Sequence, residues 1–444
     1  MRPAAILILA SALWAGDRPV PPIVELARAA PPEFFANAIL RLVQTGKIPQ
    51  REQQVELLEE AFSVAAGAKV PFRLTGLPGT PPDTREIYRS KSGELGLDTL
   101  SLQSGIVREL VTLDRAKARE LFERMPRPKL EPRPCADPLI ADVSAYYETA
   151  AIIAQSTFTN REKESELHVQ FLAAQLAGAQ SPDELAAYAR AIQSVGLSTP
   201  EWRLLLAGIA AKLQSIPTDY RPFAMSLDAL QSELANLIES GRANGIGVDE
   251  VVQSFRKYLV KQLTAARCGP DLAIGLEQVT WLQPSLTEDE SKPAKRKENF
   301  KVAQTYFESE DSKQIGSALN SLRSAGDDWK HAFSDFLRDF AAWRPDGSDL
   351  DAFHQKATVL RALLEIAPRG EDRDRVLNLC VTFLQSSPAE RQSPAEWLWE
   401  AKTLAELANL DTSKLVSQFR TSQSLSLSLY ATLNYFGASS GTSK

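Results

Sequence analysis

The sequence predicts an all-α fold of stacked antiparallel helix pairs, with an α-solenoid-like superhelix as one arrangement that such pairs adopt. Three observations predict it: apolar residues repeat with the 3.6-residue period of a helix, helix-start signals recur, and strand-like alternation is confined to one short stretch. The 444 residues are 44% hydrophobic and 24% charged, which is the composition of an ordinary globular protein. Stripes of apolar residues on one helix face must be covered by a neighbour, so the helices are expected to stack.

The helical period is clearest in the middle of the chain, and it predicts about sixteen or seventeen helices of about 12 to 25 residues. Two stripes show it, one formed by Leu185, Tyr188, Ala189, Ile192 and Val195 and the other by Leu227, Leu230, Leu234, Leu237 and Ile238.

Helix starts are marked by a hydroxyl residue, a proline in the first turn and a glutamate that reaches back to the cap. Residues 181–184 read Ser-Pro-Asp-Glu and residues 393–396 read Ser-Pro-Ala-Glu. Both predict helices that begin at the proline. Residues 199–201 and 31–33 carry weaker versions of the same signal.

Regular spacing of helix starts marks the C-terminal third. Predicted starts at Asp327, Asp349, Glu371 and Pro394 recur every 22 or 23 residues. A two-helix unit would then have about 45 residues, close to the length of HEAT-type repeats.

Serine and leucine alternate over residues 424–429, which is the strand-like stretch. Leu425, Leu429 and Leu433 also share one helix face, and no partner strand is visible, so a helix is predicted there. Proline-rich breaks at 76–82 and 126–134 and a charged stretch at 284–298 divide the chain. The predicted organisation is a signal peptide (1–16), an N-terminal helical region (17–125), a Pro-rich connection (126–136), a middle helical region (137–285), a C-terminal helical-hairpin region (286–436) and a disordered tail (437–444).

The first residues have the order of a secretory signal peptide. Arg2 precedes an apolar run at 4–15 that only Ser11 interrupts, and residues 10–12 fit the small-x-small cleavage rule. Cleavage after Ala15 or Gly16 is an alternative, and so is an uncleaved anchor. The run is too short to cross about 30 Å of hydrocarbon. We therefore expect an exported protein, periplasmic or secreted, without a membrane span in the mature chain.

The charge balance disfavours nucleic acid as a partner. The formal net charge is −6, whereas nucleic-acid binding draws on clusters of Lys and Arg. No Asn begins an Asn-x-Ser/Thr acceptor, which favours a bacterial envelope over a glycosylating secretory pathway.

An exported chain meets an oxidising space in which cysteines can pair. Cys135 and Cys268 both lie at predicted junctions between loops and helices, so a disulfide between them is predicted, with two unpaired thiols as the alternative. Cys380 lies within an apolar helical run and is expected to be a buried thiol.

Two Asp-x-x-His units, Asp328 to His331 and Asp351 to His354, suggest a metal site, because a carboxylate and an imidazole three residues apart share a helix face. Both aspartates also fall at predicted helix starts, where the helix dipole favours negative charge. The helix-start interpretation is favoured, and no metal site is predicted. The third histidine, His168, has Glu164 one turn away.

Glu239-Ser240, followed by residues 275–278 (Gly-Leu-Glu-Gln), resembles the lytic transglycosylases, in which a catalytic glutamate before a serine precedes a Gly-Leu-Met-Gln segment. The resemblance implies that Glu239 is a general acid, but Glu277 replaces the apolar Met of that segment. The favoured interpretation is a glutamate near a helix end, before Gly241.

Trp397 and Trp399 lie 200° apart around one predicted helix. We expect one of them to be an exposed contact.

No catalytic, cofactor-binding or metal-binding residue is predicted from these patterns. The expected function is a binding or scaffolding module in the cell envelope, with a protein or an envelope component as its partner. The alternatives are an envelope glycan-cleaving enzyme on a helical scaffold and a carrier with an apolar cavity between helices.

Overall fold

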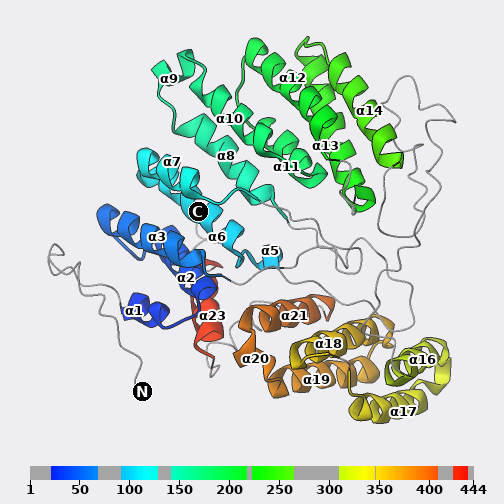
Figure 1. Cartoon of the computed structure of the whole chain (residues 1–444). Helices are drawn as coiled ribbons and strands as arrows, with labels where there is room; N and C mark the ends of the chain where they lie inside the picture. Colours follow the sequence, from blue (N-terminus) through cyan, green and yellow to red (C-terminus); the bar gives the residue numbers. More distant parts are fainter. Residues whose placement is uncertain are drawn as a thin grey trace, which may run out of the picture.

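The computed structural model describes residues 22–68, 92–128, 142–217, 223–264, 310–345, 347–408 and 424–438 (Figure 1). These residues form helices that pack against one another, with no strand among them, which confirms the all-α prediction. Within the same ranges, no helix combines the length and the apolar character that crossing a bilayer requires.

The first part of the chain, which we call the array, contains the helices up to residue 264. Its helices are α1 (Pro22–Arg28), α2 (Pro32–Gln44), α3 (Arg51–Ala65), α5 (Ser92–Leu95), α6 (Thr99–Leu113), α7 (Arg115–Arg124), α8 (Ser144–Ser156), α9 (Asn160–Glu164), α10 (Leu167–Gly178), α11 (Pro182–Ile192), α12 (Thr199–Ser215), α13 (Phe223–Ala243) and α14 (Asp249–Thr264).

The second part, the C-terminal unit, contains the helices of residues 310–408, and a last helix follows it. These are α16 (Glu310–Ser324), the 3-10 turn η2 (Gly326–Asp328), α17 (Trp329–Ala342), α18 (Asp349–Ile366), α19 (Glu371–Ser386), α20 (Ala389–Gln392), α21 (Pro394–Leu407) and finally α23 (Leu425–Ala438).

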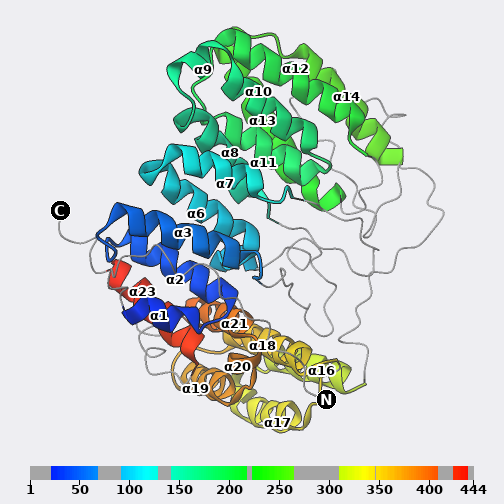
Figure 2. The ribbon, with the colours of Figure 1, turned by 60° about the vertical axis from the view of Figure 1, so that its left-hand side comes forward.

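Helices of the array stack in two layers. In one layer α6 packs on α8, α8 on α11 and α11 on α13, and in the other α10 packs on α12 and α12 on α14. In both views α8, α11 and α13 lie on the side nearer the C-terminal unit, and α10, α12 and α14 lie on the far side (Figures 1 and 2). One continuous apolar core runs through this stack, from Val24 to Leu259.

The C-terminal unit has a core of its own. It is rich in aromatic residues, and Trp329, Phe336 and Trp397 are all buried in it with Leu360 and Leu363. The predicted starts at Asp349, Glu371 and Pro394 are confirmed as the first residues of α18, α19 and α21. Near Asp327 the chain first makes the η2 turn, and α17 then begins at Trp329.

Helix caps follow the predicted signals in part. The Ser181 hydroxyl accepts a hydrogen bond from the Glu184 backbone N–H at 3.2 Å, and Ser198 forms a capping box with Glu201. At the start of α21, however, the prediction for Glu396 is wrong, because its carboxylate binds His354 on α18 instead of returning to Ser393. An ion pair with a histidine outweighed the local cap.

The strand-like stretch near residue 425 is helical, as predicted, because α23 begins at Leu425. Helix α23 continues to Ala438, two residues into the segment predicted as a tail, and Leu433 in this helix is buried. The short helices α5, α9 and α20 have four or five residues and were not expected, because a single turn leaves no periodic stripe.

Several predictions concern residues outside the described ranges. The signal peptide at 1–16, the cysteines Cys135 and Cys268, most of the connection at 126–136 and residues 439–444 all lie there. The expected disulfide between Cys135 and Cys268 therefore stays a prediction. Cys380 is unpaired and buried, as expected, and burial raises the pKa of its thiol to about 12.

Replacement of Leu360 by Ala should destabilise the C-terminal unit by about 2 to 5 kcal/mol, because the side chain is fully buried and its loss leaves a cavity. Val381→Ala, in the same unit but 40% exposed, is the matched control and should change stability by less than about 1 kcal/mol. Urea unfolding followed by tryptophan fluorescence measures both. Equal losses in the two variants would contradict this core.

Candidate functional site

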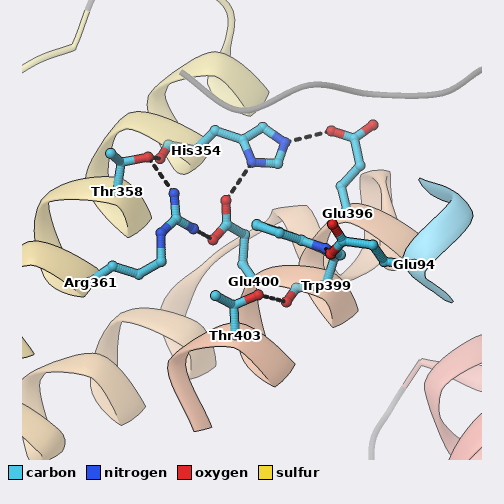
Figure 3. Close-up of polar contacts among 8 residues, drawn as sticks. All are labelled: Glu94, His354, Thr358, Arg361, Glu396, Trp399, Glu400 and Thr403. Atoms are coloured by element: carbon cyan, nitrogen blue, oxygen red, sulfur yellow. Dashed lines mark hydrogen bonds and ion pairs between the residues drawn. The ribbon is translucent and has the colours of Figure 1, made fainter. Parts of the chain in front are cut away.

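The densest buried polar cluster in the described part of the chain joins α18 and α21 (Figure 3). Helix α18 presents His354, Thr358 and Arg361 on one face, at spacings of four and three residues. Helix α21 presents Glu396 and Glu400, which are one turn apart. The residues therefore come from two helices that pack against each other.

His354 stands between two carboxylates. Its Nδ1 lies 2.8 Å from Glu400 Oε1, and its Nε2 lies 2.6 Å from Glu396 Oε2. A carboxylate can only accept hydrogen bonds, so both ring nitrogens carry protons and the ring is a cation. Burial opposes this charge, but the hydrogen bonds that the ring donates to Glu396 and Glu400 outweigh it and raise the pKa of His354 to about 9.

Glu400 is completely buried and is neutralised from two sides. The Arg361 guanidinium donates to its second oxygen, while His354 holds the first. Arg361 also donates to the Thr358 hydroxyl at 2.6 Å, and that hydroxyl donates to the His354 carbonyl at 2.8 Å. Two cations thus face two carboxylates, and the network has no net charge.

Trp399 connects this network to the array. Arg361 lies over its ring, 5.4 Å from the centroid, which is a cation–π geometry. The indole Nε1–H donates to Glu94 Oε2 on α5 at 2.6 Å, and the Thr403 hydroxyl donates to the Trp399 carbonyl at 3.0 Å (Figure 3).

The chemistry of this cluster favours a structural role. Both His354 nitrogens are bound to carboxylates, so neither presents a lone pair to a metal ion. Glu400 is saturated by His354 and Arg361, which disfavours it as a general base. Within the described ranges, no three His, Cys, Asp or Glu side chains converge in an arrangement that could hold a metal ion.

The two predicted Asp-x-x-His units do not converge. Asp351 binds Ser348 in a capping box at the start of α18, which confirms the helix-start interpretation for this residue. Asp328 precedes α17, and the largely exposed His331 lies 3.7 Å from Asp335 instead. His354 turns away from Asp351 toward a helix that begins 40 residues later, and the sequence pattern did not predict this.

His168 has a different partner from the one that its sequence neighbourhood suggests. Its Nε2 lies 3.1 Å from Glu201 Oε1 on α12, and not beside Glu164. Glu164 lies on α9, which ends before α10 begins at Leu167, and the two residues do not share a helix face.

A second buried polar cluster joins α8, α10 and α11. The Tyr146 hydroxyl donates to Gln175 at 2.8 Å, and the Tyr147 hydroxyl donates to Glu184 at 3.3 Å. The Gln180 backbone N–H donates to the other Glu184 oxygen at 2.9 Å. Burial raises the pKa of Glu184, although the hydrogen bonds from Tyr147 and Gln180 oppose this shift.

The residues behind the transglycosylase resemblance do not form a site in the described ranges. Glu239 is exposed in the last turns of α13, as the helix-end interpretation predicts, and residues 275–278 lie outside the described ranges.

The expectation for the tryptophan pair is wrong, because both Trp397 and Trp399 are buried, at 4% and 5% exposure. Trp397 faces α19, where its Nε1–H donates to the Leu384 carbonyl at 3.0 Å, and Trp399 faces α5. Helix α21 contacts α5, α18, α19, α20 and α23, so it is covered on several sides and has room for two inward tryptophans.

Comparison of the chain with protein-family models, with curated proteins and with solved structures finds no match. The site is therefore interpreted from its geometry alone.

Replacement of Glu400 by Gln should cost about 3 to 5 kcal/mol of stability, because His354 and Arg361 would lose a fully buried counter-ion. Glu396→Gln is the matched control. Its side chain is 15% exposed and contacts one of the two cations, so the loss should be clearly smaller. Chemical unfolding measures the free energy of unfolding of both variants. Equal losses of stability would contradict a central role for Glu400 in the network.

Stability should fall as the pH rises from about 6.5 to 9. The pKa of His354 in the folded protein is above its value in the unfolded chain, so its contribution is complete below pH 6.5 and is lost as the pH passes about 9. The loss should reach about 3 kcal/mol. Urea unfolding at several pH values measures it, and subtraction of the profile of His354→Gln removes the contribution of other groups, such as Cys380. Parallel profiles for the two proteins would contradict a charged His354.

Proposed function

We propose that the protein is an exported binding or scaffolding module whose helix pairs form a solenoid-like array, and that it binds a protein or another component of the cell envelope. The stacking of equivalent helices in two layers supports this most directly. In such arrays each pair contacts its neighbours, and the repetition creates an extended surface for partners.

A recurring contact in one layer supports the repeat-like character. Lys212 on α12 donates to the Ala177 carbonyl in the last turn of α10, at 2.9 Å. Lys261 on α14 donates in the same way to the Gln214 carbonyl in the last turn of α12, at 3.4 Å. A cation near a helix C-terminus satisfies its carbonyls and complements its dipole. The same type of contact thus joins α10 to α12 and α12 to α14.

The far layer also carries the exposed apolar residues that favour a protein-binding surface. Leu167 on α10 and Leu204 on α12 are 41% and 46% exposed. The pair of His168 with Glu201 holds the N-terminal turns of these two helices side by side. Exposed apolar side chains that gather into a contiguous patch are typical of contact surfaces, and we propose that these two leucines contribute to one.

The proposal that the protein is exported depends on the order of its first residues, which is that of a signal peptide. The net charge of −6 disfavours nucleic acid as the partner. Glycan cleavage is less well supported than binding, because Glu396 and Glu400 lie on one helix and both bind His354. A glycosidase instead needs two carboxylates on opposite sides of a bond.

The full chain, immobilised and exposed to an envelope extract, should retain a specific component that soluble full chain displaces. The double variant Leu167→Ser, Leu204→Ser should retain several-fold less, whereas Val381→Ser, an exposed control in the C-terminal unit, should behave like the wild type. Mass spectrometry identifies the component.

Three results would contradict the proposal. They are the absence of any displaceable component, release of soluble fragments from purified cell-wall glycan, and recovery of the chain in the cytosolic fraction. Co-purification of a stoichiometric lipid would favour the carrier instead.

A further inference from the structure

The array and the C-terminal unit have separate apolar cores, and each core includes residues that lie outside its own part of the chain. Phe34, on α2 of the array, is buried in the core of the C-terminal unit. Leu433, on α23, is buried in the core of the array. We infer that α5 and α23 form a clasp, a releasable connection that holds the C-terminal unit on the first helices of the array and sets the angle between the two parts.

Helix α23 belongs to both cores. Leu427 is fully buried in the core of the C-terminal unit, and Leu433, almost two turns later, is buried in that of the array. Between them Tyr430 meets Phe34 edge to face, with the ring centroids 6.4 Å apart. The helix packs on α2 and on α21, so it bridges the two parts directly.

Helix α5 makes the second connection. Leu95 and Leu97 are buried in the core of the C-terminal unit, and Glu94 accepts the hydrogen bond of Trp399. Asp98, the residue after Leu97, caps α6, and its carboxylate accepts a hydrogen bond from the Ser101 N–H at 3.0 Å. This short helix is therefore continuous with the array, although its side chains serve the other core.

The clasp is formed by few helices and is partly polar. Its main contacts join α21 to α5, and α23 to both α2 and α21. In both views the two parts diverge from this region (Figures 1 and 2). Glu94 is exposed, so water has access to the acceptor of the Trp399 hydrogen bond. Relative motion is the default for two parts of a chain with separate cores, unless a large apolar interface holds them together. The clasp holds the two parts together independently of whether the array binds a partner.

The test compares full-chain variants by small-angle X-ray scattering and by two probes of urea unfolding. Of the described tryptophans, Trp202 lies in the array, and Trp329, Trp343, Trp397 and Trp399 lie in the C-terminal unit. Four tryptophans thus report on that unit by fluorescence, whereas far-UV circular dichroism follows all helices. In the wild type the two unfolding curves should coincide.

The double variant Phe34→Ser, Leu433→Ser should increase the radius of gyration and separate the two curves. Trp399→Phe keeps an aromatic side chain, although a smaller one, and removes the N–H donor; it should have the same effect to a lesser degree. Leu204→Ser, exposed and remote from the clasp, is the control and should behave like the wild type. If the double variant does not fold, Trp399→Phe, which removes the donor, and Glu94→Ala, which removes the acceptor, provide the test. Folded clasp variants with an unchanged radius of gyration and coincident curves would overturn the inference.

Discussion

A helix with one apolar face is stable in water only when another helix covers that face, and the architecture of this protein follows from this constraint. In the array the helices pack on their neighbours in the stack, such as α3 on α6 and α12 on α14, so the first and the last helices have fewer neighbours. At the N-terminal end the missing cover comes from α23, which is supplied by the other end of the chain and packs on α2. The need to cover the first pair thus explains why the C-terminal unit lies where it does.

The second constraint is that a buried charged group needs partners that compensate for its lost hydration. The two parts of the chain satisfy this need in different ways. Glu400 is held between the cations of Arg361 and His354, whereas Glu184 receives a tyrosine hydroxyl and a backbone N–H and has a raised pKa. An ion network of this kind adds little stability compared with apolar packing of the same volume, but its loss in part is costly. We therefore expect the network between α18 and α21 to act mainly by excluding other registers of the two helices.

The sequence predicts what short-range interactions determine. The starts of α11, α18 and α21 are encoded by residues within four positions of one another, and so they could be identified without a structure. The partners of His354 are 42 and 46 residues away, and no local pattern identifies them. Glu396 shows why: a glutamate three residues after Ser393 is equally compatible with a capping box and with a distant ion pair, and only the packing of α18 decides. Trp397 and Trp399 could not be placed for the same reason, because the cover of α21 comes partly from α5, some 300 positions earlier in the chain.

Trp399 contacts both the buried ion network of the C-terminal unit and the connection of that unit to the array. On one side its ring contacts Arg361, whose guanidinium is fixed by Glu400, and on the other side its N–H reaches Glu94 of the array. The orientation of the indole depends on the rotation of α21 about its axis, and the His354 network fixes that rotation through Glu396 and Glu400. A displacement of α21 by part of a turn would therefore break the internal network and the connection to α5 together. Because the same helix carries both sets of contacts, the buried charges of the C-terminal unit also determine how that unit is held against the array.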